Sequence, residues 1–85
     1  MWRETVPQFK VRHIDGGEEV VTAARSAVDG SVTLFESPTG GTWKVIKQFP
    51  TVEVEGVQRR VVEASGMARW VTDRPKQVIA SRSWV

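Results

Sequence analysis

Residues 20–49 decide the fold, and they read VVTAARSAVDGSVTLFESPTGGTWKVIKQF. Asp29-Gly30 lies between two runs rich in Val, Ala and Thr. This dipeptide is the strongest short-range hairpin signal, because a tight turn needs positive φ values that Asp tolerates and Gly accepts freely. Residues 37–41, SPTGG, predict a second turn. The stretch therefore predicts three antiparallel strands joined by two turns.

The register of the first hairpin stays open at this point. In one register Arg25 faces Leu34, and in another, slipped by one residue, Arg25 lies near Phe35. Both registers place Val32 and Leu34 together on one face. Because side chains alternate with a period of two, the register determines which face is buried.

The third strand of this stretch shows a clearer alternation of apolar and polar residues. Trp43, Val45 and Phe49 are predicted to share one apolar face, as in a half-buried strand. Lys47 falls on the same face, near a rim where its alkyl stem packs and its ammonium reaches water.

The apolar composition favours strands throughout the chain. The sequence contains 15 Val and 3 Ile but only 1 Leu. Val is stiff at its first side-chain torsion and suits a pleated sheet, whereas Leu is preferred by helices. Glu18 and Glu19 open the first strand of the hairpin, which is thus predicted over residues 18–28, and further strands are predicted over residues 8–14, 51–55, 58–64, 67–72 and 77–85.

Residues 54–71 also carry a helical pattern. Six small apolar side chains recur there at spacings of three and four, which is typical of one helix face. Gly56 and Gly66 oppose that interpretation, since each costs about 1 kcal/mol inside a helix. We predict an all-β domain over residues 1–85, an antiparallel meander of six to eight strands curled into a sheet or small barrel. The alternative is an α+β fold with one helix over residues 55–65.

Composition also excludes several chemistries. The chain has no Cys, so it has no disulfide, thiolate nucleophile or cysteine metal site. The first residues, MWRETVP, lack a signal-peptide pattern, and no apolar run approaches the roughly 20 residues of a membrane span. We expect a cytoplasmic protein with no membrane partner, no cofactor, no bound metal and no small-molecule substrate.

The single histidine gives little support for catalysis. General acid–base chemistry needs a group that titrates near neutral pH, usually His. His13 shares its predicted strand face with Phe9 and Val11, which is typical of a sheet margin. An acidic turn follows at residues 15–19, DGGEE, but it matches no known order of metal ligands. We therefore predict no enzymatic activity.

The four tryptophans, each close to a cation in sequence, indicate binding. Trp and Arg are the residues that most often anchor protein interfaces. A last strand ending at Val85 carries neither Pro nor an acidic residue, so it is predicted to be an edge that can accept a partner strand. The first strand is the other predicted edge. The partner-binding residues predicted from this pattern are Trp2, Arg82, Trp84 and Val85.

Nucleic acid is the alternative partner. Residues 1–42 carry four basic and six acidic groups, whereas residues 43–85 carry eight basic and four acidic groups. Basic residues interleaved with aromatic rings are typical of proteins that bind single-stranded nucleic acid. The residues predicted for that role are Lys44, Lys47, Arg59, Arg60, Arg69, Arg74, Lys76 and Arg82. Neighbours in a strand point to opposite faces, however, so Lys44 and Trp43 are not expected to share a surface, nor are Arg69 and Trp70.

The leading functional hypothesis is a non-enzymatic module that binds another protein or a second copy of itself. The small size and the lack of catalytic groups are typical of accessory proteins of phages and mobile elements. No family is recognised from the residues.

Overall fold

The computed structural model describes residues 7–74 and 76–77 of the chain. Eight strands and one short 3₁₀ helix follow one another in this part. They are β1 (Gln8–His13), β2 (Glu18–Thr22), β3 (Arg25–Asp29), β4 (Val32–Thr39), β5 (Thr42–Pro50), η1 (Thr51–Glu53), β6 (Val54–Val62), β7 (Ala68–Asp73) and β8 (Lys76–Gln77).

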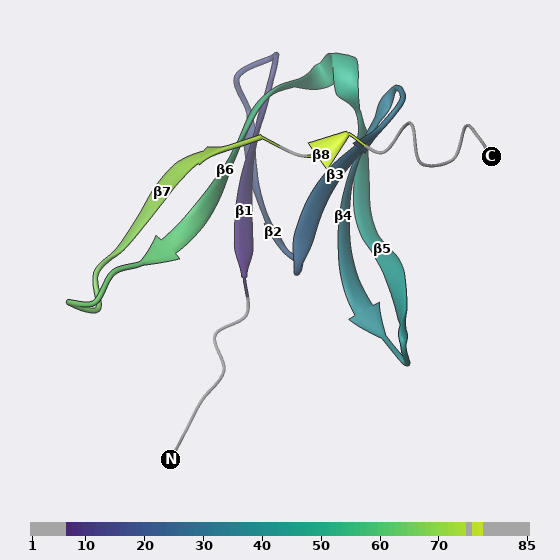
Figure 1. Cartoon of the computed structure of the whole chain (residues 1–85). Helices are drawn as coiled ribbons and strands as arrows, with labels where there is room; N and C mark the ends of the chain where they lie inside the picture. Colours follow the sequence, from purple (N-terminus) through teal and green to yellow (C-terminus); the bar gives the residue numbers. More distant parts are fainter. Residues whose placement is uncertain (1–6, 75, 78–85) are drawn as a thin grey trace.

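These strands form two sheets of four (Figure 1). Sheet A has the order β2-β1-β6-β7, and sheet B has the order β5-β4-β3-β8. All pairs are antiparallel except the short pairing of β3 with β8. The prediction of a small all-β fold is confirmed. The alternative helix over residues 55–65 is wrong, because β6 occupies most of that range.

The strand order differs from a simple meander at β1. This first strand lies between β2 and β6, with Val11 opposite both Glu19 and Val57. The prediction that it forms a sheet edge is therefore wrong. A central position explains why Phe9 and Val11 are buried, since neighbours cover them on both sides.

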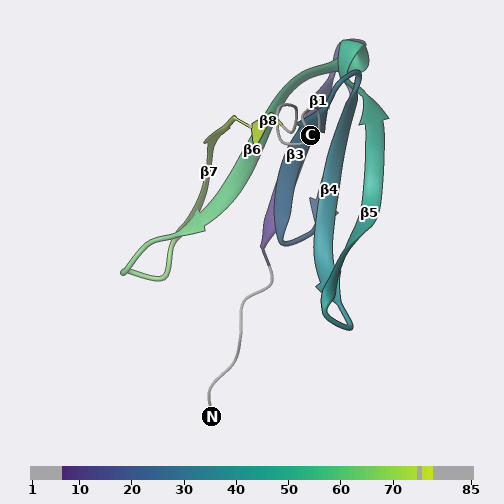
Figure 2. The same cartoon turned by 45° about the vertical axis from the view of Figure 1, so that its right-hand side comes forward.

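Short links carry the chain between the sheets three times, and the last of them joins β7 of sheet A to β8 of sheet B. Ala23 and Ala24 break the predicted strand over residues 18–28 and send β2 into sheet A and β3 into sheet B. The 3₁₀ helix η1 carries the chain back from β5 to β6. Figures 1 and 2 show that the β4–β5 and β6–β7 hairpins extend away from the body of the molecule in different directions.

The core lies between the sheets and is built around three phenylalanines. Phe35 of β4 is fully buried, and its ring centroid lies 5.4 Å from that of Phe9 and 6.0 Å from that of Phe49. Val11, Val21, Ala23 and Val57 complete the cluster. The rings supply the bulk that a core with little Leu otherwise lacks.

Polar contacts also join the two sheets at their sides. The Ser26 hydroxyl of β3 donates a hydrogen bond of 2.6 Å to the Asp73 carboxylate of β7. On the opposite side, Lys47 Nζ of β5 lies 2.9 Å from a carboxylate oxygen of Glu19 of β2.

The first hairpin turns one residue later than predicted. Asp29 pairs with Val32, so the loop is Gly30-Ser31, and neither predicted register is correct. Gly30 has a φ of 63°, and no residue other than glycine has a positive φ in the described part of the chain. This is the pattern of a type II′ turn, which needs positive φ only at its first central residue.

The new register changes which residues of β4 are buried. Thr33 and Phe35 face the other sheet, and Val32 and Leu34 lie on the opposite face. Thr33 remains satisfied there because its hydroxyl hydrogen-bonds to that of Thr51 at 3.0 Å.

The strand predicted over residues 51–55 is only partly correct, because residues 51–53 form η1 and β6 begins at Val54. Val52 lies in η1 and is 76% exposed, so it does not face the core, whereas Val54 packs partly against it. The predicted strand over residues 77–85 lies outside the described residues except for its first position.

Candidate functional site

The terminal residues predicted to bind a partner fall outside the part that the structure describes. Trp2, Arg82, Trp84 and Val85 all belong to this group. A candidate site must therefore be built from the two tryptophans that are described, Trp43 on β5 and Trp70 on β7.

A β-bulge decides where Trp43 points. Phe35 pairs with Lys47, but the next residue, Glu36, pairs with Val45, so Ile46 is an extra residue in β5. A bulge of this kind shifts the alternation of side chains along the strand. Lys47 keeps the core face beside Phe35, while Val45 and then Trp43 turn to the outer face of sheet B.

The predicted apolar face of β5 is consequently wrong for two of its three residues. Phe49 is buried, but Trp43 is 47% exposed and Val45 is 42% exposed. Lys47 behaves as predicted, because its ammonium reaches the rim beside Glu19 and lies 5.8 Å from the Phe49 ring centroid.

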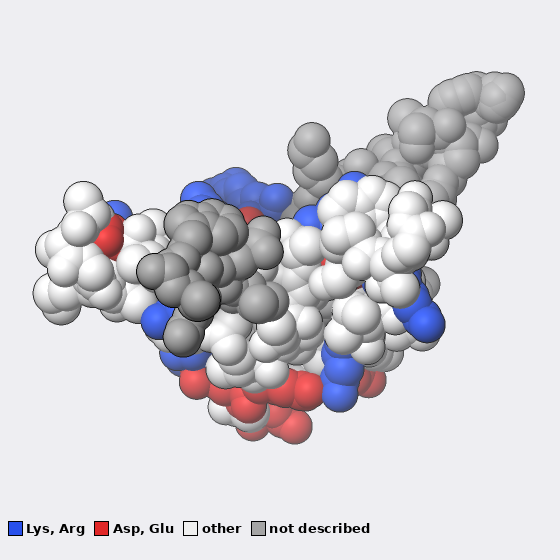
Figure 3. Space-filling view, turned by 90° about the horizontal axis from the view of Figure 1, so that it is seen from below, with Lys and Arg blue, Asp and Glu red and all other residues white. Residues whose placement is uncertain are grey.

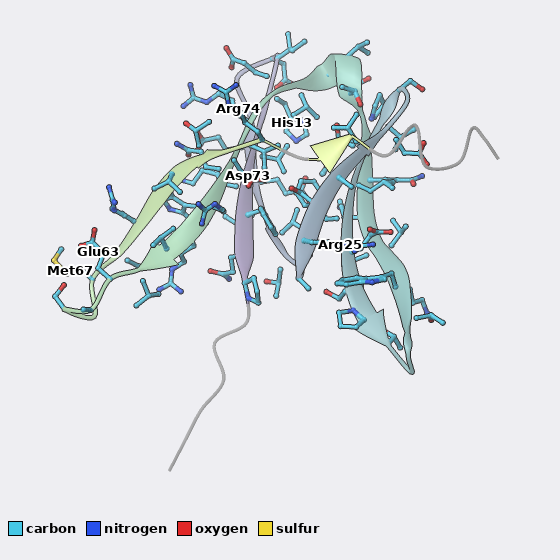
Figure 4. All side chains as sticks on the ribbon, viewed as in Figure 1. His13, Arg25, Glu63, Met67, Asp73 and Arg74 are labelled. Atoms are coloured by element: carbon cyan, nitrogen blue, oxygen red, sulfur yellow. The ribbon has the colours of Figure 1, made fainter. Side chains whose placement is uncertain are left out.

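The outer face of sheet B holds Trp43 in a defined arrangement. The guanidinium carbon of Arg25 lies 3.5 Å from the centre of the Trp43 ring. Arg25 Nε in turn donates a hydrogen bond of 3.0 Å to the carboxylate of Glu36. Because Arg25 and Glu36 are direct partners across β3 and β4, the strand register sets up the contact. Figure 4 labels Arg25 on β3.

The backbone beside this arrangement is also anchored. The Ala24 N–H donates both to the Glu36 carbonyl at 2.8 Å and to the Ser37 hydroxyl at 3.0 Å. Pro38 lies directly opposite Trp43 across the strand pair, Val45 lies two residues further along β5, and Ile46 is exposed at the bulge. We define the tryptophan patch as Arg25, Pro38, Trp43, Val45 and Ile46. The Arg25 charge is balanced by Glu36, so the patch combines exposed apolar area with little net charge.

Trp70 lies in a different electrostatic setting, on the outer face of sheet A. Lys10 reaches across β6 and places its ammonium 4.7 Å from the centre of the Trp70 ring. Arg60 is the direct cross-strand partner of Trp70. In the described part of the chain neither Lys10 nor Arg60 forms an ion pair, so this surface stays cationic.

The basic residues predicted to bind nucleic acid do not form one surface. Arg59 lies 3.7 Å from Asp73, Arg69 lies 2.7 Å from Glu63, and Lys47 is paired with Glu19. In the view of Figure 3 most of the visible acidic atoms gather at the lower edge, with a separate acidic group at the left-hand end, and the basic atoms form several separate groups.

The remaining predicted cations are also dispersed. Lys44 pairs with Ser37 and lies on the face opposite Trp43, and Arg69 pairs with Val61 on the face opposite Trp70, as predicted. Arg74 follows β7. Lys76 is described only as part of β8, and Arg82 lies outside the described residues.

A cleft of about 680 Å³ is lined mainly by β6, with further residues from β1, β3, β4, η1 and the end of β7. Three cations line it, Lys10, Arg12 and Arg74, together with the carboxylates of Glu55 and Asp73. Figure 4 labels Asp73 and Arg74. The pKa of Arg12 is raised above its ordinary value, first by the hydrogen bond to Glu18 and the negative charge of Glu18, and then by the charge of Glu55. Two carboxylates therefore already offset the charge of this arginine.

His13 takes part in packing at the sheet margin. Its ring centroid lies 5.0 Å from that of Phe49, and its Nε2 lies 3.8 Å from a carboxylate oxygen of Glu19. Among the described residues, no group of three or more His, Asp or Glu side chains is arranged to hold a metal ion. No described helix is long and apolar enough to cross a membrane.

Comparison of the chain with protein-family models, with curated proteins and with solved structures finds no match. Any function must therefore be argued from the two tryptophan surfaces. Sequence reasoning found neither, because it had no sign of the bulge that exposes Trp43 or of the strand order that brings Lys10 to Trp70.

Proposed function

We propose that this chain is a non-enzymatic module that binds another protein through the tryptophan patch. The observation that carries the proposal is the exposed Trp43 ring held against Arg25, which is itself fixed by Glu36. Tryptophan and arginine are the commonest anchors of protein interfaces, and an anchor that is already ordered loses little side-chain entropy on binding.

The face of β5, and not its edge, is the surface suited to docking. The exposed edge of β5 is protected from pairing with a strand of another protein by Lys44, Lys47 and the bulge at Ile46. They leave the outer face accessible, where Trp43 and Val45 are 47% and 42% exposed, and Ile46 at the bulge is 48% exposed. Neighbouring exposed apolar side chains of this kind mark interaction sites in soluble proteins.

Affinity capture from the native host tests the proposal. Trp43→Ala should lose capture of a specific protein by about 10-fold or more, because an anchor residue typically contributes at least 1–2 kcal/mol. Val52→Ala is the matched control, since Val52 is an exposed apolar residue outside the patch. Equal recovery of the same proteins by wild type and Trp43→Ala, or recovery that depends wholly on nucleic acid, contradicts the proposal.

The surface around Trp70 favours nucleic acid as a second candidate function. It combines an aromatic ring with two cations, Lys10 and Arg60, that have no described acidic partner. Single-stranded nucleic acid binds by stacking bases on aromatic rings while cations contact the phosphates.

Retention of single-stranded oligonucleotides at low salt measures this activity. Trp70→Ala should weaken retention by about 5-fold or more, and added salt should weaken it steeply in the wild type. Trp43→Ala serves as the control and should bind as the wild type does. No retention by the wild-type chain at low salt removes this second function.

A further inference from the structure

The strand β7 presents the least protected edge in the described part of the molecule. It pairs only with β6 there, over six residue pairs and without any register shift. The edge of β5 is protected from strand pairing by its lysines and its bulge, and the edge of β2 is protected by Glu18 and Glu19. The strand β8 has only two described residues. The sequence of β7, ARWVTD, contains neither Lys nor Pro.

The position of β7 leaves this edge accessible. Figures 1 and 2 show the β6–β7 hairpin projecting from the body of the molecule. Figure 4 shows Glu63 and Met67 at its far tip, where a Glu63 N–H to Met67 carbonyl hydrogen bond of 2.8 Å closes the turn. An ordered, projecting strand with an open edge is a template for another strand.

The sequence of β7 is complementary to itself about Val71. Antiparallel pairing of two copies around a two-fold axis at Val71 brings Val71 opposite Val71 of the second copy. The same register places Trp70 opposite Thr72 and Arg69 opposite Asp73. Both charged pairs are attractive, and cross-strand pairs of opposite charge stabilise a sheet whereas like charges destabilise it.

We infer that a second copy of this chain pairs along β7, joining two A sheets into one eight-stranded sheet. Arg69 already contacts Glu63 through Nε, and its guanidinium retains further N–H donors for a carboxylate. Asp73 is held in place by Ser26 and lies 3.7 Å from Arg59. The interface is isologous, so it closes at a dimer.

This inference goes beyond the proposed binding function, because it uses a surface separate from the tryptophan patch. Six residues on each strand make a small contact, so we expect a transient dimer. Trp43→Ala should therefore dimerise as the wild type does, and the two proposals can fail independently.

Single-cysteine variants test the register, because the natural chain contains no Cys. Under mild oxidation Val71→Cys should form a disulfide-linked dimer at least about 10-fold faster than Thr72→Cys. Directly opposite residues have Cβ atoms close enough for a disulfide, whereas residue 72 faces residue 70 of the second copy. Equal rates, or faster linkage of Thr72→Cys, overturn the inference.

A charge exchange tests the same register without oxidation. Arg69→Glu and Asp73→Lys should each weaken the dimer by about 10-fold, and their mixture should recover dimers because both cross-strand pairs again become attractive. Light scattering on nuclease-treated protein is the readout, with circular dichroism to verify folding. A wild type that stays monomeric as its concentration rises, or an assembly that disappears with nuclease, overturns the inference even if Asp73→Lys fails to fold.

Discussion

At the scale of single residues, a few positions control which side chains are buried and which are presented. Gly30 starts the first turn one residue later than the Asp-Gly signal predicts, and this turn places Phe35 in the core. Ile46 is the extra residue that turns Val45 outward. Both residues act through the backbone, so their importance is not visible from hydrophobicity.

Gly30→Ala should destabilise the fold by about 1–2 kcal/mol, because Gly30 has a φ of 63° that L residues adopt at a cost. No atom lies within 4 Å of an added Cβ, so the loss is conformational rather than steric. Chemical denaturation measures it.

Gly56→Ala is the matched control for that measurement. Gly56 also has open space around an added Cβ but lacks a positive φ, so we expect stability between unchanged and about 1 kcal/mol higher. Equal destabilisation by both substitutions contradicts the assigned turn.

At the scale of elements, the alternation of Val and polar residues predicted most of the strands. It failed where a strand face carries a charge. Arg59 shares the face of β6 that carries Val57 and Val61 but is exposed and forms an ion pair with Asp73. The two valines on either side of it therefore gave the false helical spacing. The face of Trp43 could not be predicted, because a bulge depends on the partner strand.

The contact between β3 and β7 is a second feature that sequence reasoning could not supply, since it joins residues 47 positions apart. Ser26→Ala should lower the free energy of unfolding by about 1–2 kcal/mol, because it removes a hydrogen bond to a charged carboxylate that joins the two sheets.

Ser31→Ala is the control, since Ser31 lies in an exposed turn and its side chain makes no described hydrogen bond. The free energy of unfolding of this variant should differ from that of the wild type by less than about 0.5 kcal/mol. Thermal unfolding compares the two variants. A loss in Ser26→Ala no larger than that in Ser31→Ala shows that the sheets do not depend on this link.

At the scale of the whole molecule, two small sheets enclose one aromatic core and present different outer faces. Sheet B presents a tryptophan whose neighbouring arginine is balanced by a carboxylate, and sheet A presents a tryptophan beside cations with no described partner. The molecule therefore has two tryptophan surfaces that differ in charge, while its only histidine packs at the rim of the core.

The central claim is that the tryptophan patch contacts another protein, and site-specific photo-cross-linking in extracts of the native host tests it most directly. A photoreactive amino acid at position 43 should give a discrete protein adduct that survives nuclease treatment. The same group at position 52, an apolar site that is even more exposed, should not give that adduct. Absence of an adduct at position 43, or the same adducts from both positions, contradicts the account.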